Sequence, residues 1–258
     1  MQASIEIDRS PAVQYLLRIG DTCLILGQRL GEWCGHAPII EEDIALTNMA
    51  LDLIGQARGV LTLAGDQCPQ DYDEDQLAFL RDERDYFNVT MVELPRGDFA
   101  FTVLRNAMVA TLFRLLWERL ADSSDAELAG IAGKAVKEVR YHQRHAADWI
   151  VRLADGTAES RRRSERALDE LWRYTPEWFD EDDAVDAAAQ ASGLGPRWAD
   201  LREPWLAEMG AILGEARLPV PTESAFRSEG RRGRHSEHMG YLLAEMQSLQ
   251  RSFPGGVW

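Results

Sequence analysis

Carboxylates and histidines on the apolar faces of long helices are the side chains here that could bind a metal pair. A di-iron helical bundle needs an inward Glu from each of two helices and a Glu-x-x-His pair from each of the other two. Residues three apart lie on one helix face, so both side chains of such a pair can reach the same ion. No Glu-x-x-His occurs in this sequence, and the nearest arrangements, Glu32–His36 and Glu138–His142, have a spacing of four. Both histidine pairs that a di-iron centre requires are therefore missing.

Single polar side chains nevertheless occupy places where a metal bundle carries its ligands. Glu138 and His142 share a helical stripe with apolar residues, Asp52 shares another with small residues, and Asp21 lies in the middle of an apolar run. The run 99–121 offers no such group, since its acids lie at or beyond its ends. The sequence therefore predicts a relic metal site that binds no metal, at Asp21, Asp52, Glu138 and His142.

Carboxylates on inward faces that bind no metal need other partners, because an unpaired buried charge is costly. Asn48 lies one turn from Asp52 and is expected to face inward with it. We expect salt bridges and hydrogen bonds to fill the relic site, with cations supplied by Lys134, Arg58 and Arg105.

The remaining histidines and cysteines indicate no second site. His235 and His238 form an HxxH pair, but no acidic or cysteine partner lies at ligand spacing, so a structural role is expected. His36, in a turn, is expected to bond local backbone. The three cysteines form no CxxC pair, which argues against a zinc site or a disulfide framework. Nucleophile-elbow, P-loop and dinucleotide fingerprints are absent from the sequence.

The elements that position these residues are predicted to be helices throughout. Four amphipathic runs of about 20 residues or more, 12–31, 40–64, 99–121 and 125–153, are the inventory of a four-helix bundle. The run 99–121 is followed by Ser124, a candidate N-cap. Shorter helices are expected at 74–93, 160–174, 181–192, 198–214 and 235–251. The stretch 215–234 is rich in Pro, Gly and charge, which indicates an extended arm. The predicted fold is all-α: one ferritin-like four-helix bundle domain over 1–258, with additional C-terminal helices and the arm.

Composition limits the classes of partner. The net charge of −15 repels nucleic acid and anionic membranes, although local arginines can still bind an anionic ligand. No apolar run reaches 18 residues, and the first residues lack a signal-peptide core. We therefore expect a cytoplasmic, soluble protein that binds neither nucleic acid nor membrane.

Several segments, taken together and in order, resemble one known family. They are 15–38, 41–58, 77–100, 132–157, 167–179 and 235–255, and the most diagnostic stretches are GEWCGHAP (31–38), RDER (81–84) and KEVRYH (137–142). In these segments the chain resembles the C subunits of bacterial phenylacetyl-CoA epoxidases, over nearly its whole length.

That resemblance implies a non-catalytic structural subunit of a multicomponent oxygenase. In such a complex a homologous catalytic A subunit holds the di-iron centre and epoxidises the aromatic ring of phenylacetyl-CoA. A reductase subunit with FAD, an iron–sulfur cluster and NADPH supplies the electrons, and this chain would hold no cofactor. The alternative is a self-sufficient ferritin-like di-metal oxidoreductase, which would need ligands from the four relic positions.

The resemblance also implies which residues lie close to the substrate. One patch follows the RDER stretch and comprises Asp85, Tyr86, Phe87 and Asn88. The second patch, matched poorly in residue type, comprises Asp186, Ala187 and Ala188. Ordinary packing at a helix end is the alternative role for Tyr86 and Phe87.

The residue composition also predicts a large protein-binding face. Trp, Tyr and Arg anchor permanent interfaces, and the chain has eight tryptophans and a cation set made almost wholly of arginine. We place this face on the first two helices and the GEWCGHAP turn, with Trp33 as an anchor. The alternative is that Trp33 closes the end of the bundle.

Overall fold

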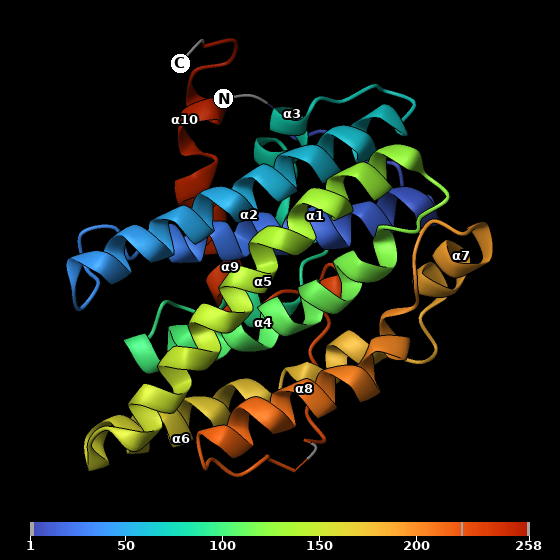
Figure 1. The fold of residues 1–258 in the computed structure, drawn as a ribbon. Coiled ribbons are helices and arrows are strands. Elements are labelled where there is room, and N and C mark those ends of the chain that lie inside the picture. The colour runs from blue at the N-terminus through green and yellow to red at the C-terminus, as the bar shows by residue number, and fades with distance from the viewer. Residues whose placement is uncertain (1–2, 223, 257–258) are drawn as a thin grey trace.

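A computed structural model describes residues 3–222 and 224–256 of the chain. Its centre is a bundle of four long helices: α1 (Pro11–Gly31), α2 (Ile40–Asp66), α4 (Phe99–Leu120) and α5 (Ala126–Asp155). Figure 1 shows these four side by side, with α1 packed on α2 and α4 packed on α5. No strand occurs in the described residues, where one isolated β-bridge joins Glu229 to Arg234. The predicted all-α four-helix bundle is confirmed.

The helix boundaries follow from local sequence. Pro11 starts α1, where its fixed φ suits the first turn and its missing N–H is not needed. The carboxylate of Asp98 caps α4 by accepting the N–H of Phe101 at 2.9 Å. α5 is capped in the same way by Asp125, not by the predicted Ser124. The carboxylate of Asp125 accepts two free N–H groups of the first turn, which explains the shift of one residue.

A second layer of shorter elements covers the α4–α5 pair. α6 (Ala158–Trp172) and α8 (Arg202–Glu215) pack along it on the side away from α2, and α7 (Ala184–Ser192) packs on α1 (Figure 1). The 3₁₀ turns η3 (Thr175–Phe179) and η4 (Trp198–Leu201) connect these helices. The buried apolar residues of both layers belong to one hydrophobic cluster, which includes Trp178 and Trp205.

α4 is the central helix of this core. It is the one helix among the described residues that is long and apolar enough to cross a membrane, and 83% of that apolar stretch is buried inside the protein. The core of a soluble bundle produces the same pattern, because a helix that is surrounded on every side is apolar on every side.

The predicted helix over 74–93 is wrong. The chain forms α3 (Glu74–Phe79) and then two separate 3₁₀ turns, η1 (Glu83–Asp85) and η2 (Thr90–Glu93). The reason lies in α1, whose side chains bind the backbone of this connection. Asp21 accepts the N–H of Phe87 at 2.9 Å, and the hydroxyl of Thr22 accepts the N–H of Val89 at 3.2 Å. N–H groups held in this way are not available for helical hydrogen bonds.

The C-terminal segments differ from the prediction in detail. The described parts of the predicted arm, 215–222 and 224–234, have no regular secondary structure over most of their length, and the turn η5 (Gly230–Arg232) interrupts the second of them. The predicted helix 235–251 is divided into α9 (Glu237–Met246) and α10 (Ser248–Ser252). The segment 198–214 begins with η4, and only its later part is α-helical, as α8.

Trp33 closes the end of the bundle. Its ring is 5% exposed, and its Nε1–H donates to the hydroxyl of Thr102 at 3.0 Å. The Arg96 guanidinium lies 4.7 Å from the ring centroid, and Phe99 packs edge-on at 5.8 Å. A side chain so enclosed has little surface to offer a partner, so its predicted use as an interface anchor is wrong.

Candidate functional site

Asp21, the first of the four relic positions, forms a fully buried ion pair. Both its oxygens contact the guanidinium of Arg81, which follows α3, one of them at 3.0 Å from Nη1. Neither side chain has any exposed surface. Arg81 also donates to the backbone oxygen of Asp85 at 2.8 Å, and its guanidinium lies over the ring of Tyr86. The carboxylate of Asp21 thus holds the connection after α3 against α1.

Asp52 and His142 meet across the contact between α2 and α5. The Nε2 atom of His142 lies 3.0 Å from Oδ2 of Asp52, and the histidine is 4% exposed. Burial lowers the pKa of His142, although the hydrogen bond and charge of Asp52 act in the opposite direction. The imidazole is therefore neutral near pH 7 and donates its Nε2–H to the carboxylate. This pair is one that the sequence predicted and the fold brings together.

Glu138 does not point to the bundle interior as predicted. Its side chain is 21% exposed at the rim, where it accepts a hydrogen bond from Gln56 at 3.0 Å and lies 3.6 Å from Lys134. The predicted inward Asn48 is likewise exposed. Of the predicted cationic partners only Lys134 contacts a relic position; Arg58 pairs with Glu74, and Arg105 donates to the backbone oxygen of Leu94.

A small apolar cavity borders one of the four positions, His142. It is lined by aliphatic side chains and Phe113, with Asn106 and His142 as its polar residues. Within the described part of the chain, no three His, Cys, Asp or Glu side chains come close enough together to hold a metal ion. The donor set of this bundle therefore does not fit a di-iron centre.

A buried pair that the sequence analysis missed joins η2 to the start of α9. Nδ1 of His235 lies 2.6 Å from Oε1 of Glu93, and Nε2 lies 3.0 Å from the backbone oxygen of Tyr86. Both partners are acceptors, so both ring nitrogens carry protons and the imidazole is charged. Burial alone would lower the pKa of His235, but the hydrogen bond and charge of Glu93 raise it above its ordinary value.

Because its folded pKa is raised, His235 is expected to stabilise the fold most at low pH. This contribution is complete below the unfolded pKa of about 6.5 and is lost as pH rises through the higher folded pKa. The difference in Tm between the wild type and His235→Gln should therefore be largest near pH 5.5 and shrink toward pH 9. The partly exposed His238, replaced by Gln, is the control. A Tm difference that grew with pH would show that His235 is buried in its neutral form.

Two arginines and two aspartates form a second buried network that the sequence analysis did not find. Arg18 of α1 contacts Asp183 at 2.7 Å and Asp186 at 2.9 Å, and Arg231 of the arm contacts Asp186 at 2.7 Å. Although burial would raise it, the pKa of Asp183 is lowered to about 2 by the hydrogen bond and charge of Arg18. The network fastens the arm and the N-terminus of α7 to α1.

Glu177, in η3, connects this network to the segment before α4. Its carboxylate accepts the N–H of Thr90 at 3.0 Å, the N–H of Arg231 at 2.8 Å and the hydroxyl of Ser228 at 2.6 Å. Burial raises the pKa of Glu177, and the three hydrogen bonds oppose that rise. The arm is therefore bonded to two parts of the chain. Gly230 donates to the hydroxyl of Thr90 in η2, and Arg231 pairs with Asp186 of α7.

The two patches expected near substrate thus meet the same part of the arm, but most of their side chains face inward. Tyr86, Phe87, Asn88 and Asp186 are buried, and Asp186 is held by two arginines. The patch members that reach the surface are Asp85, Ala187 and Ala188. Tyr86 and Phe87 therefore pack in the core, in line with the packing role left open for them.

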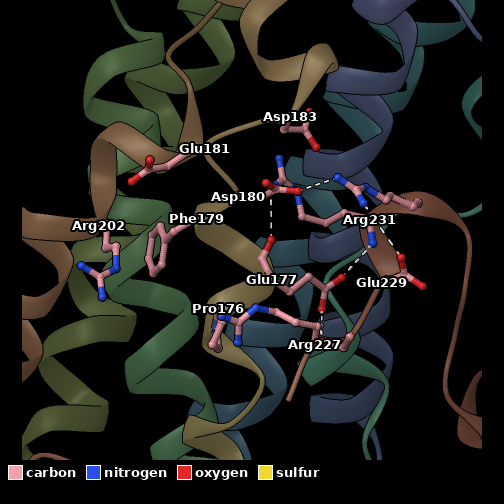
Figure 2. A pocket seen from close by; sticks show the side chains of 12 residues that line it. Pro176, Glu177, Phe179, Asp180, Glu181, Asp183, Arg202, Arg227, Glu229 and Arg231 are labelled. Atoms are coloured by element: carbon pink, nitrogen blue, oxygen red, sulfur yellow. Dashed lines mark hydrogen bonds and ion pairs between the residues drawn. The ribbon is translucent and has the colours of Figure 1, made fainter. Parts of the chain in front are cut away.

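A hollow lies between the arm and the segment 176–183. Its volume is about 650 Å³. Figure 2 shows Arg202 and Glu181 on one side of the hollow and Glu229 and Arg231 on the other. We call it the arm groove; its walls carry four arginines (Arg202, Arg227, Arg231 and Arg232) and five carboxylates. An apolar hollow lined by Trp172, Phe179, Trp205 and Val220 adjoins it through shared residues.

Comparison with known proteins agrees with the sequence resemblance. The family model described as phenylacetic acid catabolic protein matches residues 1–258. The chain is 48% identical over 244 residues to the C subunit of 1,2-phenylacetyl-CoA epoxidase from Escherichia coli (strain K12), and the match covers 95% of this chain and 98% of that protein. On this similarity and the helical fold, the chain belongs to the phenylacetic acid catabolic protein family.

Proposed function

We propose that this chain is a non-catalytic, structural subunit of a multicomponent di-iron oxygenase that epoxidises the ring of phenylacetyl-CoA in phenylacetate catabolism. The identity to the C subunit of a 1,2-phenylacetyl-CoA epoxidase supports the assembly and its reaction. The non-catalytic role rests on one structural observation. Each of the four relic positions has a protein partner, and no three His, Cys, Asp or Glu side chains of the described residues come close enough together to hold a metal ion.

Under this proposal the redox chemistry belongs to other subunits. The di-iron centre would lie in a catalytic subunit, and FAD, the iron–sulfur cluster and NADPH in a reductase. The alternative, a self-sufficient di-metal oxidoreductase, would need carboxylate ligands from at least three helices. Here Asp52 and His142 alone meet, while Asp21 is bound to Arg81 and Glu138 lies at the rim.

The arm groove is the surface of this chain that we place beside the CoA part of the substrate. CoA carries phosphates, which guanidinium groups bind through paired N–H donors. Three arginines that reach the surface, Arg202, Arg227 and Arg232, line the groove beside five carboxylates, and its neighbour offers aromatic and aliphatic walls. Both patches expected near substrate adjoin the arm that forms one wall, since the backbone oxygen of Asn88 lies against Gly230 and Asp186 pairs with Arg231.

Substitution at the relic positions tests the non-catalytic role. In the reconstituted complex, Glu138→Gln and His142→Gln are each expected to keep turnover within about twofold of wild type, because neither side chain takes part in chemistry. Since Glu138 is partly exposed, its loss should cost less than about 1 kcal/mol of stability. Co-elution with the catalytic subunit is followed in parallel. A variant that still assembles but has lost turnover would assign a catalytic role to this chain.

A further inference from the structure

The small cavity beside His142 lies where all four long helices of the bundle meet. Leu26 of α1, Leu53 of α2, Asn106 of α4 and His142 of α5 are among its lining residues, every one of which is buried. The space that the centre of a water-sized sphere can occupy there is about 10 Å³. Sites of about 10–15 Å³ on this measure accommodate one water molecule, provided that polar groups line them.

Asn106 brings to this cavity a carbonyl oxygen without a protein partner. The residue is 4% exposed, and its Oδ1 atom is buried with no hydrogen-bond donor of the described chain in reach. Buried amide oxygens are almost always hydrogen-bonded, because an unmet acceptor inside a protein lowers stability. A donor is therefore required at this point of α4, and the described side chains supply none.

His142 brings a second acceptor to the same cavity. Its Nε2–H donates to the carboxylate of Asp52 on α2, at 3.0 Å. A neutral imidazole carries one proton, so Nδ1 is left as an acceptor. The Oδ1 atom of Asn106 and the Nδ1 atom of His142 cannot bond each other directly, since neither carries a hydrogen.

The chemistry of two acceptors selects the molecule that joins them. Anions and dioxygen cannot donate a hydrogen bond. A transition metal ion needs more ligands than one nitrogen and one amide oxygen, and no three His, Cys, Asp or Glu side chains of the described residues lie close enough to provide them. An ammonium ion donates, but bringing an unpaired charge into a mainly apolar cavity is costly. Water has the right size and donates two hydrogen bonds.

We infer that Asn106 and His142 hold one water molecule in this cavity, which donates one hydrogen to each of them. The site goes beyond the proposed function and does not depend on it. Through the water, Asp52 of α2, His142 of α5 and Asn106 of α4 form a continuous chain of hydrogen bonds across the bundle. The remaining long helix, α1, contributes apolar side chains to the wall.

A crystal structure of the full wild-type chain, at a resolution that shows ordered water, tests the site. We expect one peak of density in the cavity, within about 2.7–3.2 Å of both Oδ1 of Asn106 and Nδ1 of His142. In solution near neutral pH, nitrogen NMR should show His142 protonated at Nε2 and not at Nδ1. A long-lived water should also give a nuclear Overhauser effect to the ring protons of His142.

Asn106→Leu removes the carbonyl and keeps the size of the side chain. It should abolish both the density peak and the Overhauser effect. Asn48→Leu makes the same change at an exposed position of α2 and should leave both signals as in wild type. If Asn106→Leu fails to fold, the wild-type density and NMR signals decide the question by themselves.

Three results would overturn the inference. The first is a wild-type cavity without density, and the second is a His142 ring protonated at Nδ1. The third is a peak with the anomalous scattering of a metal, which would make the occupant an ion. A water that persists in folded Asn106→Leu would show that Asn106 does not hold it, and the assignment to this residue would be wrong.

Discussion

Asp21→Asn is expected to lower the Tm of the isolated chain by roughly 6–20 °C. The substitution keeps the shape of the side chain but leaves the buried guanidinium of Arg81 without its counter-charge, at a cost of about 3–5 kcal/mol. For a chain of this size each kcal/mol lowers Tm by roughly 2–4 °C. The N–H of Phe87 also loses its charged acceptor, so the connection after α3 should become accessible to protease.

Glu74→Gln is the control for this prediction. Its carboxylate pairs with Arg58 at 2.8 Å on the surface, where an ion pair contributes less than about 1 kcal/mol. Thermal unfolding of the two variants side by side should give a large shift for Asp21→Asn and a small one for Glu74→Gln. Equal shifts would mean that the Asp21–Arg81 pair does not hold the connection to α1.

Charge reversal in the arm groove is expected to weaken use of the CoA ester by the reconstituted complex. Arg232 lies on the groove wall with a half-exposed side chain, paired with Asp180 and Glu229. A hydrogen bond from a guanidinium to a phosphate contributes about 1.5–3 kcal/mol, so Arg232→Glu should raise KM for phenylacetyl-CoA at least about tenfold. The kcat should stay near wild type, because the groove is remote from the chemistry under the proposed function.

The control for the groove is Arg162→Glu, which makes the same change of charge on the exposed face of α6. Arg232→Gln, which removes the charge without reversing it, should give a smaller rise in KM. An unchanged KM in folded, assembled Arg232→Glu complex would remove the arm groove from the CoA site.

The long helices could be predicted from the sequence because their apolar period extends over some 20 residues each. The segment 74–93 carries a similar period, yet Asp21 and Thr22 of α1 bind its backbone and prevent a helix. A local pattern cannot reveal a competitor that lies more than fifty residues earlier in the chain. The same limit explains Glu138. Its helical stripe predicts a side chain that faces the bundle interior, but in the structure this side chain lines a surface groove between α2 and α5.

Site residues joined by long-range contacts could not be paired from the sequence. His235 and Glu93 are 142 residues apart, and Arg231 and Asp186 belong to segments without a shared periodicity. One signal was present: Arg18 lies inside the apolar run YLLRIGDTCLIL, where a charged side chain requires a buried partner. The absence of Glu-x-x-His, by contrast, is visible in the sequence alone, and it led to the expectation of a relic site.

The iron content of the purified chain tests the central claim most directly. The chain would be expressed alone with added iron, and its metal would be measured by elemental analysis together with its turnover of phenylacetyl-CoA. A di-iron bundle needs carboxylates and histidines that converge, and here Asp52 and His142 alone meet, while Asp21 is bound to Arg81 and Glu138 to Gln56. We expect less than about one iron per chain and no turnover until the catalytic subunit is added. Two tightly held irons per chain, with the spectrum of a di-iron centre, would contradict the account.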